Sequence, residues 1–310
     1  MKMNKKYLVT GSNGLVGTAI RELIGEGHVY HTREKANLLD KEKTLLFFKK
    51  AVDEGVNSVI HCAARVGGVK ANSSDNAGFF EDNMAITDNV ISACYDLRIE
   101  NFVNLLSTCI FPDKEVTYPL TSNQIDNGDP HHSNYGYSYA KRFSGYKTKT
   151  YRKVTGLNWI NVVPTNVYGD HDNYNLDNSH VIPGMIHKAY LASLNNSDFI
   201  IWGDGTPLRQ FIHAKDLAHN ILWAVDNWKS ENHFMCINEQ EHSIKDIAFL
   251  VAKNFGIEES RIIFDENQPK GQHRKPAKTD IPVEYDFIDI EKGIFEACNW
   301  FKDNYRIARK

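Results

Sequence analysis

The segment that most constrains the fold is a glycine turn between a short apolar run and an amphipathic stretch. Residues 7–9 are apolar, and the turn that follows reads Gly11-Ser12-Asn13-Gly14-Leu15-Val16-Gly17. Apolar residues then recur at helical spacing, at Leu15, Val16, Ala19, Ile20, Leu23 and Ile24. This order of strand, turn and helix predicts a dinucleotide-binding unit, because glycine lets a pyrophosphate approach the positive end of the helix.

Strand-like and helix-like segments alternate through the first half of the chain. Apolar runs predict buried strands at residues 56–64, 102–107 and 159–164. Helical periodicity is found between them, at residues 41–54, 84–98 and 138–154. Because strands that alternate with helices form parallel sheets covered on both faces, we expect an α/β, Rossmann-type doubly wound sheet.

The second half of the chain has a different pattern. A long polar loop at residues 169–179 is followed by mixed segments, which predict a smaller α/β lobe over the strand ends, where such folds bind ligands. We therefore expect an NADP-binding Rossmann domain at residues 1–168, with segments near 204–235 returning to it. Residues 169–310 are expected to form mainly a substrate-binding lobe.

Composition excludes several classes of protein. The 310 residues carry a net charge of −3 without a sustained basic run, which argues against binding to nucleic acid or an anionic membrane. The apolar runs are shorter than a membrane span and the N-terminus enters a strand directly, so we expect a cytoplasmic protein. Five cysteines without paired spacing suit a reducing compartment, and no His/Cys cluster suggests a metal site.

The residues after the second strand bear on the cofactor. An NAD site carries a carboxylate about twenty residues after the glycines, where it binds the ribose 2′-hydroxyl. Here His31 and Thr32 supply none, and Arg33 can pair with a 2′-phosphate, although Glu34 follows it. We therefore expect NADP(H). Further cofactor contacts are expected at Leu38, Leu39, Leu105, Pro164, Asn166, Val167 and His180.

A second pattern, Tyr137-Ser138-Tyr139-Ala140-Lys141, points to chemistry at a carbonyl group. Tyr137 and Lys141 are four residues apart, so on a helix they share one face. The ammonium is expected to favour the tyrosinate and to lower a phenol pKa that is usually near 10. Tyr137 would then donate a proton to a ketone under reduction, with Ser107 as a second hydrogen-bond donor.

Ser107 and Cys109 end an apolar strand. In extended backbone they point to the same side, so we expect a hydroxyl and a thiol together beside the nicotinamide. A thiolate at Cys109 can remove a carbon-bound proton next to a ketone, and His180 can return one to the opposite face. The remaining cysteines are expected to be small buried hydrophobes, namely Cys62, Cys94, Cys236 and Cys298.

These patterns occur together with three longer motifs: Pro164-Thr165-Asn166-Val167-Tyr168-Gly169-Asp170-His171-Asp172-Asn173, Ser179-His180-Val181-Ile182-Pro183 and Trp202-Gly203-Asp204-Gly205-Thr206-Pro207-Leu208-Arg209-Gln210-Phe211. Nearly end to end, the chain resembles a family of extended short-chain dehydrogenases/reductases, the GDP-4-keto-6-deoxy-D-mannose 3,5-epimerase/4-reductases. The resemblance implies NADPH-dependent conversion of GDP-4-keto-6-deoxy-D-mannose to GDP-L-fucose.

The resemblance also assigns roles. Ser107, Tyr137 and Lys141 match the reductase residues, whereas Cys109 and His180 match the pair that inverts C3 and C5. Substrate contacts are implied at Lys188, Trp202, Arg209 and Lys275, with core packing as the alternative for the tryptophan. Two positions depart from the family pattern, which usually has an acidic residue at Lys270 and in some relatives Arg at Asn13.

Two other interpretations remain open. A single-step nucleotide-sugar epimerase or ketoreductase would use the same fold without a carbon-acid base and acid. A non-catalytic nucleotide-binding protein would tolerate the loss of Tyr137 or Lys141. The resemblance further implies a homodimer that pairs the helices near residues 84–98 and 138–154, the second of which carries Tyr139, Phe143, Tyr146 and Thr150 near one stripe.

Overall fold

The computed structural model describes residues 5–114, 116–268 and 273–310. Its largest sheet has six strands in the order β2-β1-β3-β4-β5-β9, and all neighbours are parallel. Because β2 lies on one side of β1 and β3 on the other, the ligand crevice is expected at the carboxyl ends of β1 and β3. The strands are Tyr7–Thr10 (β1), Val29–Tyr30 (β2), Ser58–His61 (β3), Asn101–Leu105 (β4), Asn158–Pro164 (β5) and Phe234–Cys236 (β9).

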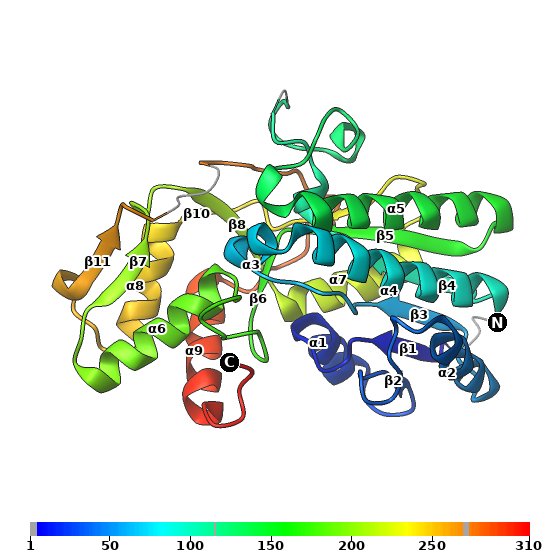
Figure 1. Cartoon of the computed structure of the whole chain (residues 1–310), viewed down its shortest axis with the longest axis horizontal. Coiled ribbons are helices and arrows are strands. Elements are labelled where there is room, and N and C mark those ends of the chain that lie inside the picture. Colours follow the sequence, from blue (N-terminus) through cyan, green and yellow to red (C-terminus); the bar gives the residue numbers. More distant parts are fainter. Residues whose placement is uncertain (1–4, 115, 269–272) are drawn as a thin grey trace.

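Helices cover both faces of this sheet (Figure 1). One face packs against α1 (Leu15–Ile24) and α7 (Ala214–Asn227), which contact each other. The other face is covered by α2 (Lys41–Asp53), α4 (Asn76–Asp96) and α5 (Tyr135–Thr155). The central strands are buried on both sides, as expected for a parallel sheet between two helical layers. The predicted α/β doubly wound fold is confirmed.

A second lobe stands beside the carboxyl ends of these strands (Figure 1). It has a three-stranded sheet, β10-β8-β6, and a two-stranded parallel sheet, β11-β7. Its core is aromatic, with Tyr174, Phe199, Phe211 and Phe301 buried together. The elements are Asn166–Tyr168 (β6), Val181–Asn195 (α6), Phe199–Trp202 (β7), Leu208–His213 (β8), Glu241–Ser243 (β10), Ile244–Asn254 (α8), Ile262–Asp265 (β11) and Ile290–Asn304 (α9).

Two elements from the second half of the chain return to the large sheet. Strand β9 pairs with β5, and α7 packs against α1. The domain boundary near residue 168 stays a prediction. Short helices complete the chain at Val69–Ser74 (α3), Thr108–Ile110 (η1), Ser122–Gln124 (η2), His132–Asn134 (η3) and Glu259–Arg261 (η4). Within the described ranges, no helix is both long and apolar enough to span a membrane.

One segment near the C-terminal end crosses from the second lobe back over the large sheet. Leu208 N–H donates to the carbonyl of His273 at 2.9 Å, and Leu120 N–H donates to that of Pro276 at 2.8 Å. Asp280 N–H then donates to the carbonyl of Met235 in β9 at 2.8 Å. This crossing segment, residues 273–280, therefore links the two lobes beside the loop that follows β4.

Candidate active site

The glycine turn joins β1 to α1. Gly11 has a φ of +66°, and a Cβ on it would lie 2.9 Å from the backbone nitrogen of Ala63. A Cβ on Gly17 would lie 2.2 Å from the carbonyl oxygen of Gly11. Gly14 caps α1 without a side-chain hydrogen bond, and the first turn of α1 has no acidic residue. The N–H groups at this helix start therefore fit the pyrophosphate of a dinucleotide.

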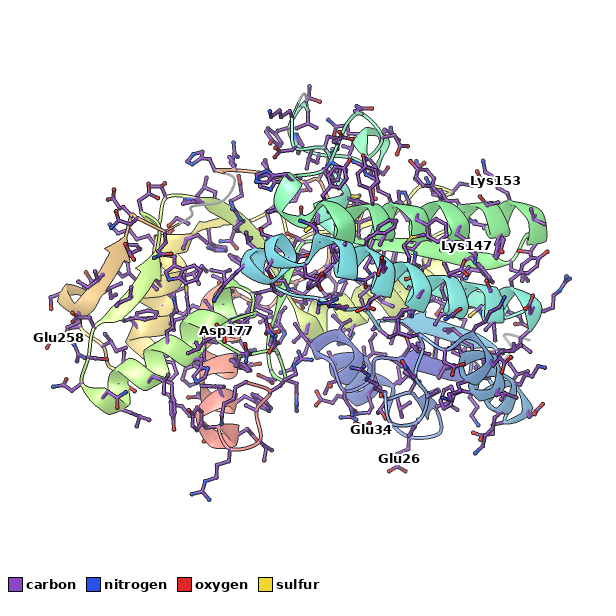
Figure 2. The ribbon with its side chains drawn as sticks, in the orientation of Figure 1. Glu26, Glu34, Lys147, Lys153, Asp177 and Glu258 are labelled. Atoms are coloured by element: carbon purple, nitrogen blue, oxygen red, sulfur yellow. The ribbon has the colours of Figure 1, made fainter. Side chains whose placement is uncertain are left out.

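His31, which the sequence analysis did not assign a role, closes this turn. Its carbonyl accepts hydrogen bonds from Ser12, from the backbone N–H at 3.1 Å and from Oγ at 2.8 Å. Arg33 is exposed two residues further on, and Glu34 lies at the same outer edge (Figure 2). Arg21 of α1 donates to Asn13 Oδ1 at 3.3 Å, which brings a second cation to the turn.

The remaining predicted cofactor residues lie at strand ends or in the loop before α2. Leu38 is buried and its carbonyl accepts from Asn89 Nδ2 at 2.8 Å, so it packs in the core while Leu39 is exposed. Leu105 and Pro164 are the last residues of β4 and β5. In β6, Asn166 is exposed and Val167 is half-buried. These residues surround the carboxyl edge of the large sheet.

The residues after β4 turn sharply. Ser107 caps η1, its Oγ accepts from the N–H of Cys109 at 3.2 Å, and Cys109 lies inside that short helix. The expectation of extended backbone through Cys109 is therefore wrong. The serine hydroxyl and the thiol nevertheless both lie beside the Tyr137 phenol, and the hydroxyl forms a hydrogen bond with it. The turn brings three candidate catalytic groups together.

Burial has the largest effect on the pKa of the Tyr137 phenol. It raises the pKa of Tyr137, the nearby Cys109 raises it further, and the hydrogen bond with Ser107 lowers it. The predicted lowering of this pKa is therefore wrong. Lys141 does not offset this rise, because its Nζ donates to the carbonyl of Leu105 at 2.8 Å and lies 5.8 Å from the centre of the tyrosine ring. Tyr137 thus keeps its proton at neutral pH.

Lys141 is a buried cation, with 3% of its surface exposed. Burial lowers its pKa to about 8, while the neighbouring Cys62 acts in the opposite direction. An ammonium has three donors, and one of them is taken by the Leu105 carbonyl. The remaining donors fit the polar oxygens of a bound cofactor beside Tyr137.

Cys109 differs from Cys94, Cys236 and Cys298, which are buried. It is half-buried, and Lys275 from the crossing segment is an electrostatic neighbour of the thiol. Lys275 Nζ donates to the carbonyl of Phe111, two residues after the thiol, at 3.2 Å. By contrast, Cys94, Cys236 and Cys298 pack in hydrophobic cores, as expected. Cys62 is half-buried rather than buried as expected, and desolvation raises the pKa of its thiol to about 12.

His180 is the N-cap residue of α6, and its side chain makes no capping hydrogen bond. The ring is exposed, yet the protein atoms around it lower its pKa below the usual value, with Arg309 adding to this effect. Among the described residues, no hydrogen bond or ion pair joins His180 to Cys109. Its role as the second acid therefore stays a prediction.

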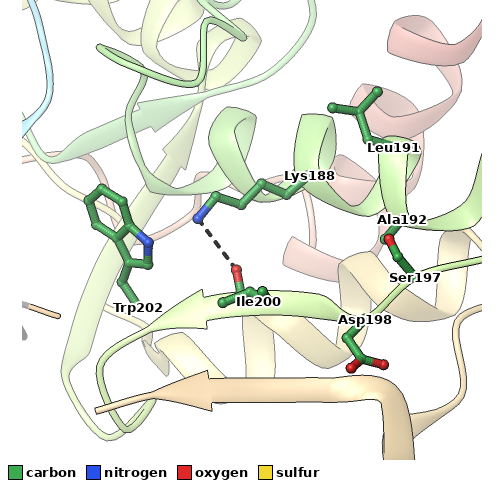
Figure 3. Close-up of a pocket in the computed structure, with 7 residues that line it drawn as sticks. All are labelled: Lys188, Leu191, Ala192, Ser197, Asp198, Ile200 and Trp202. Atoms are coloured by element: carbon green, nitrogen blue, oxygen red, sulfur yellow. Dashed lines mark hydrogen bonds between the residues drawn. The ribbon is translucent and has the colours of Figure 1, made fainter. Parts of the chain in front are cut away.

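The predicted substrate residues line the second lobe. Trp202 ends β7 with 44% of its surface exposed, which removes core packing as its explanation. Lys188 Nζ lies 4.7 Å from the centre of its ring, and both border an open cavity of about 330 Å³ (Figure 3). Arg209 in β8 donates to the carbonyl of Leu208 at 2.7 Å, and burial lowers its pKa. Lys270 lies outside the described residues.

A buried polar row supports the site and was missed in the sequence. Thr10, His61, Asn104 and Asn161 are in register across β1, β3, β4 and β5, and all are buried. Thr10 Oγ1 pairs with His61 Nδ1 at 2.8 Å, and Asn104 Nδ2 donates to Asn161 Oδ1 at 2.9 Å. Taken one at a time, these polar residues are typical of loops and surfaces. Only the register of the strands brings them together, and the sequence does not show that register.

A Rossmann sheet with Ser107, Tyr137 and Lys141 at one strand end defines the short-chain dehydrogenase/reductase class. The model of the NAD dependent epimerase/dehydratase family matches residues 7–238. The GDP-L-fucose synthase of Dictyostelium discoideum is 41% identical, over 99% of this chain and 98% of that protein. That of Escherichia coli (strain K12) is 31% identical, over 97% of both.

Solved structures agree with these relatives. A GDP-L-fucose synthetase from Naegleria fowleri bound to NADP superposes with a TM-score of 0.91 at 33% identity, covering 100% of this chain and 96% of that one. The chain therefore belongs to the NAD dependent epimerase/dehydratase family, in the group of the GDP-L-fucose synthases.

Proposed function

We propose that this protein converts GDP-4-keto-6-deoxy-D-mannose to GDP-L-fucose, inverting C3 and C5 and reducing the C4 ketone with NADPH. The proposal rests on one observation: Ser107, Cys109 and Tyr137 lie beside one another just after β4. In this arrangement two donors can stabilise an oxyanion while the thiol removes a proton from the neighbouring carbon. The relatives named GDP-L-fucose synthase support it, as does the NADP-bound neighbour.

The chemistry divides among the residues as follows. C3 and C5 both flank the C4 ketone, so the protons on both carbons are acidified by the same carbonyl. Cys109, as thiolate, removes each proton on one face, and His180 supplies a proton on the other. Ser107 and Tyr137 donate hydrogen bonds to the C4 oxygen as its negative charge develops.

The reduction uses the same donors. NADPH, when bound, supplies the hydride for C4. Tyr137, which holds its proton at neutral pH, then gives that proton to the C4 oxygen. Lys141 holds the adjoining polar groups in place from the buried side of α5.

Substrate recognition falls to the second lobe and the crossing segment. Lys188, Arg209 and Lys275 provide positive charge for a diphosphate, and Trp202 offers an exposed aromatic face. We also propose that the protein works in the cytoplasm and as a homodimer.

A turnover experiment tests the function. Incubation with GDP-4-keto-6-deoxy-D-mannose and NADPH should oxidise the cofactor and give GDP-L-fucose by NMR of the product. The Cys109→Ser variant should still bind NADPH, but should lose the exchange of solvent deuterium into C3 and C5. Reduction without inversion would favour a simple ketoreductase, and no NADPH oxidation would favour a nucleotide-binding protein without catalysis.

A further inference from the structure

Ser179, the residue directly before His180, is enclosed by two glycines from different elements. A Cβ on Gly68, the N-cap residue of α3, would lie 2.5 Å from the carbonyl oxygen of Ser179. A Cβ on Gly184, in the first turn of α6, would lie 2.8 Å from Ser179 Oγ. Both distances are below 3.0 Å, which real Cβ atoms essentially never show.

Backbone conformation does not explain either glycine. Gly68 has φ −67° and ψ 178°, which any residue can adopt. Gly184 lies in a regular helix, where alanine is the preferred residue and glycine is unfavourable. An added Cβ would therefore force Ser179 to shift from both sides, moving its backbone carbonyl in the first case and its hydroxyl in the second.

Further contacts hold the same turn against the large sheet. Gly68 N–H donates to the carbonyl of Asn178 at 2.9 Å, and Lys70 pairs with Asp177 at 3.1 Å. The buried Asn72 fixes this loop from within, because its Nδ2 donates to the carbonyls of Gly67 and Gly68 at 2.6 and 3.1 Å. Figure 2 shows Asp177 between the two lobes. The loop after β3 thus contacts and holds the backbone that leads into His180.

We propose that Gly68 and Gly184 are positioning residues, which hold Ser179 so that the imidazole of His180 faces the sugar carbon it protonates. The imidazole makes no capping bond of its own, so the backbone on either side determines where the ring lies. This inference rests on the proposed function of His180. It couples the loop after β3, on the cofactor side, to the acid carried by the second lobe.

The two contacts predict that the two glycine variants respond differently to a second substitution at Ser179. Gly68→Ala and Gly184→Ala should each slow C3/C5 inversion at least tenfold, measured by NMR of the product formed in D2O. Deuterium exchange by Cys109 and NADPH binding should persist in both, because neither glycine touches the thiol or the cofactor turn. A variant that only weakened the fold would lose all three together.

Ser179→Ala supplies the decisive test. It removes Oγ, the atom that alanine at position 184 would meet, so it should restore inversion to Gly184→Ala. It leaves the carbonyl oxygen, so it should not restore inversion to Gly68→Ala. Gly128→Ala serves as the matched control, since a Cβ there meets Pro112 Cβ at an ordinary 3.6 Å.

The outcomes separate the inference from the function beneath it. Absence of exchange and inversion in the wild-type protein would overturn the proposed function and the inference with it. Normal exchange and inversion in the wild type, together with wild-type inversion in both glycine variants, would overturn the inference alone. Should Gly68→Ala fail to fold, the Gly184→Ala variant with and without Ser179→Ala decides the matter, and failure of rescue counts against it.

Discussion

Burial sets the behaviour of Lys141, and this has a consequence for stability. The pKa of its ammonium falls from a usual 10.5 to about 8 in the folded chain. Between these two values the unfolded chain holds a proton that the folded chain has released. Unfolding free energy should therefore rise with pH across this window, by up to roughly 3 kcal/mol from this group alone.

The Lys141→Met variant isolates the effect. Urea unfolding of both proteins at several pH values from 7.5 to about 10.5 would give two curves of stability against pH. The wild-type curve should climb more steeply than that of the variant. Parallel curves would show that the ammonium is not desolvated as its position indicates.

Arg33 should decide between the two nicotinamide cofactors. It is exposed after β2, about twenty residues from the glycine turn, where an NAD site carries a carboxylate. Arg33→Ala should reduce the ratio of kcat/KM for NADPH over NADH by roughly tenfold or more, as expected for one charge-assisted hydrogen bond to a phosphate. Lys49→Ala, an exposed lysine of α2, is the control for net charge. An unchanged ratio in Arg33→Ala would assign the 2′-phosphate to another group.

The residue scale is also where prediction from sequence reached its limit. The types and spacing of Ser107, Cys109 and Tyr137 were enough to expect them together, and the structure brings them together. The sequence could not show that Lys141 donates to a backbone carbonyl rather than acting on the phenol, because that depends on the depth of α5 against β4. The glycines at 68 and 184 carried no signal, since their neighbours are distant in the chain.

At the scale of elements, periodicity was informative where one face of a helix is apolar. The predicted helices at 41–54 and 138–154 correspond to α2 and α5. Helix α4 begins at Asn76 rather than near 84, because Asp75 caps it and the buried, polar Asn83 interrupts the apolar spacing. Pro183, in the first turn of α6, would read as a helix breaker, yet a first turn needs no N–H from it.

The polar row under α5 should stabilise the element that carries Tyr137 and Lys141. The two N–H groups of Asn104 Nδ2 are shared among Ser144 Oγ and Thr148 Oγ1 of α5 and Asn161 Oδ1, at 3.1, 3.2 and 2.9 Å. Asn104→Leu leaves these buried oxygens short of a donor and should lower the unfolding free energy by about 1–3 kcal/mol. Lys49→Leu, on the exposed side of α2 and away from α5, should change it by less than about 0.5 kcal/mol. Equal effects of the two variants in urea unfolding would contradict a role for the row.

For the whole molecule, the outer surface of α4 and α5 is the surface proposed for contact with a second copy of the chain. These helices lie side by side on one face of the large sheet (Figure 1). Their large exposed side chains are Phe80, Tyr135, Tyr146 and Val154. Two copies that meet through this surface would bury the same patch on both sides, as a two-fold dimer requires.

Sedimentation velocity tests the dimer directly. The wild-type protein should sediment at about twice the chain mass of 35.4 kDa. Tyr146→Glu places a charge in the middle of the patch and should shift the protein towards the monomer, because an unpaired charge in an apolar interface costs several kcal/mol. Val283→Glu changes an apolar side chain that is 98% exposed outside the patch and should leave the dimer intact. The proposed catalytic groups all come from one chain, from η1 and its cap Ser107, from α5 and from the start of α6, so the monomeric variant should retain turnover. A wild-type protein that sediments as a monomer would contradict the dimer proposed through the outer surface of α4 and α5.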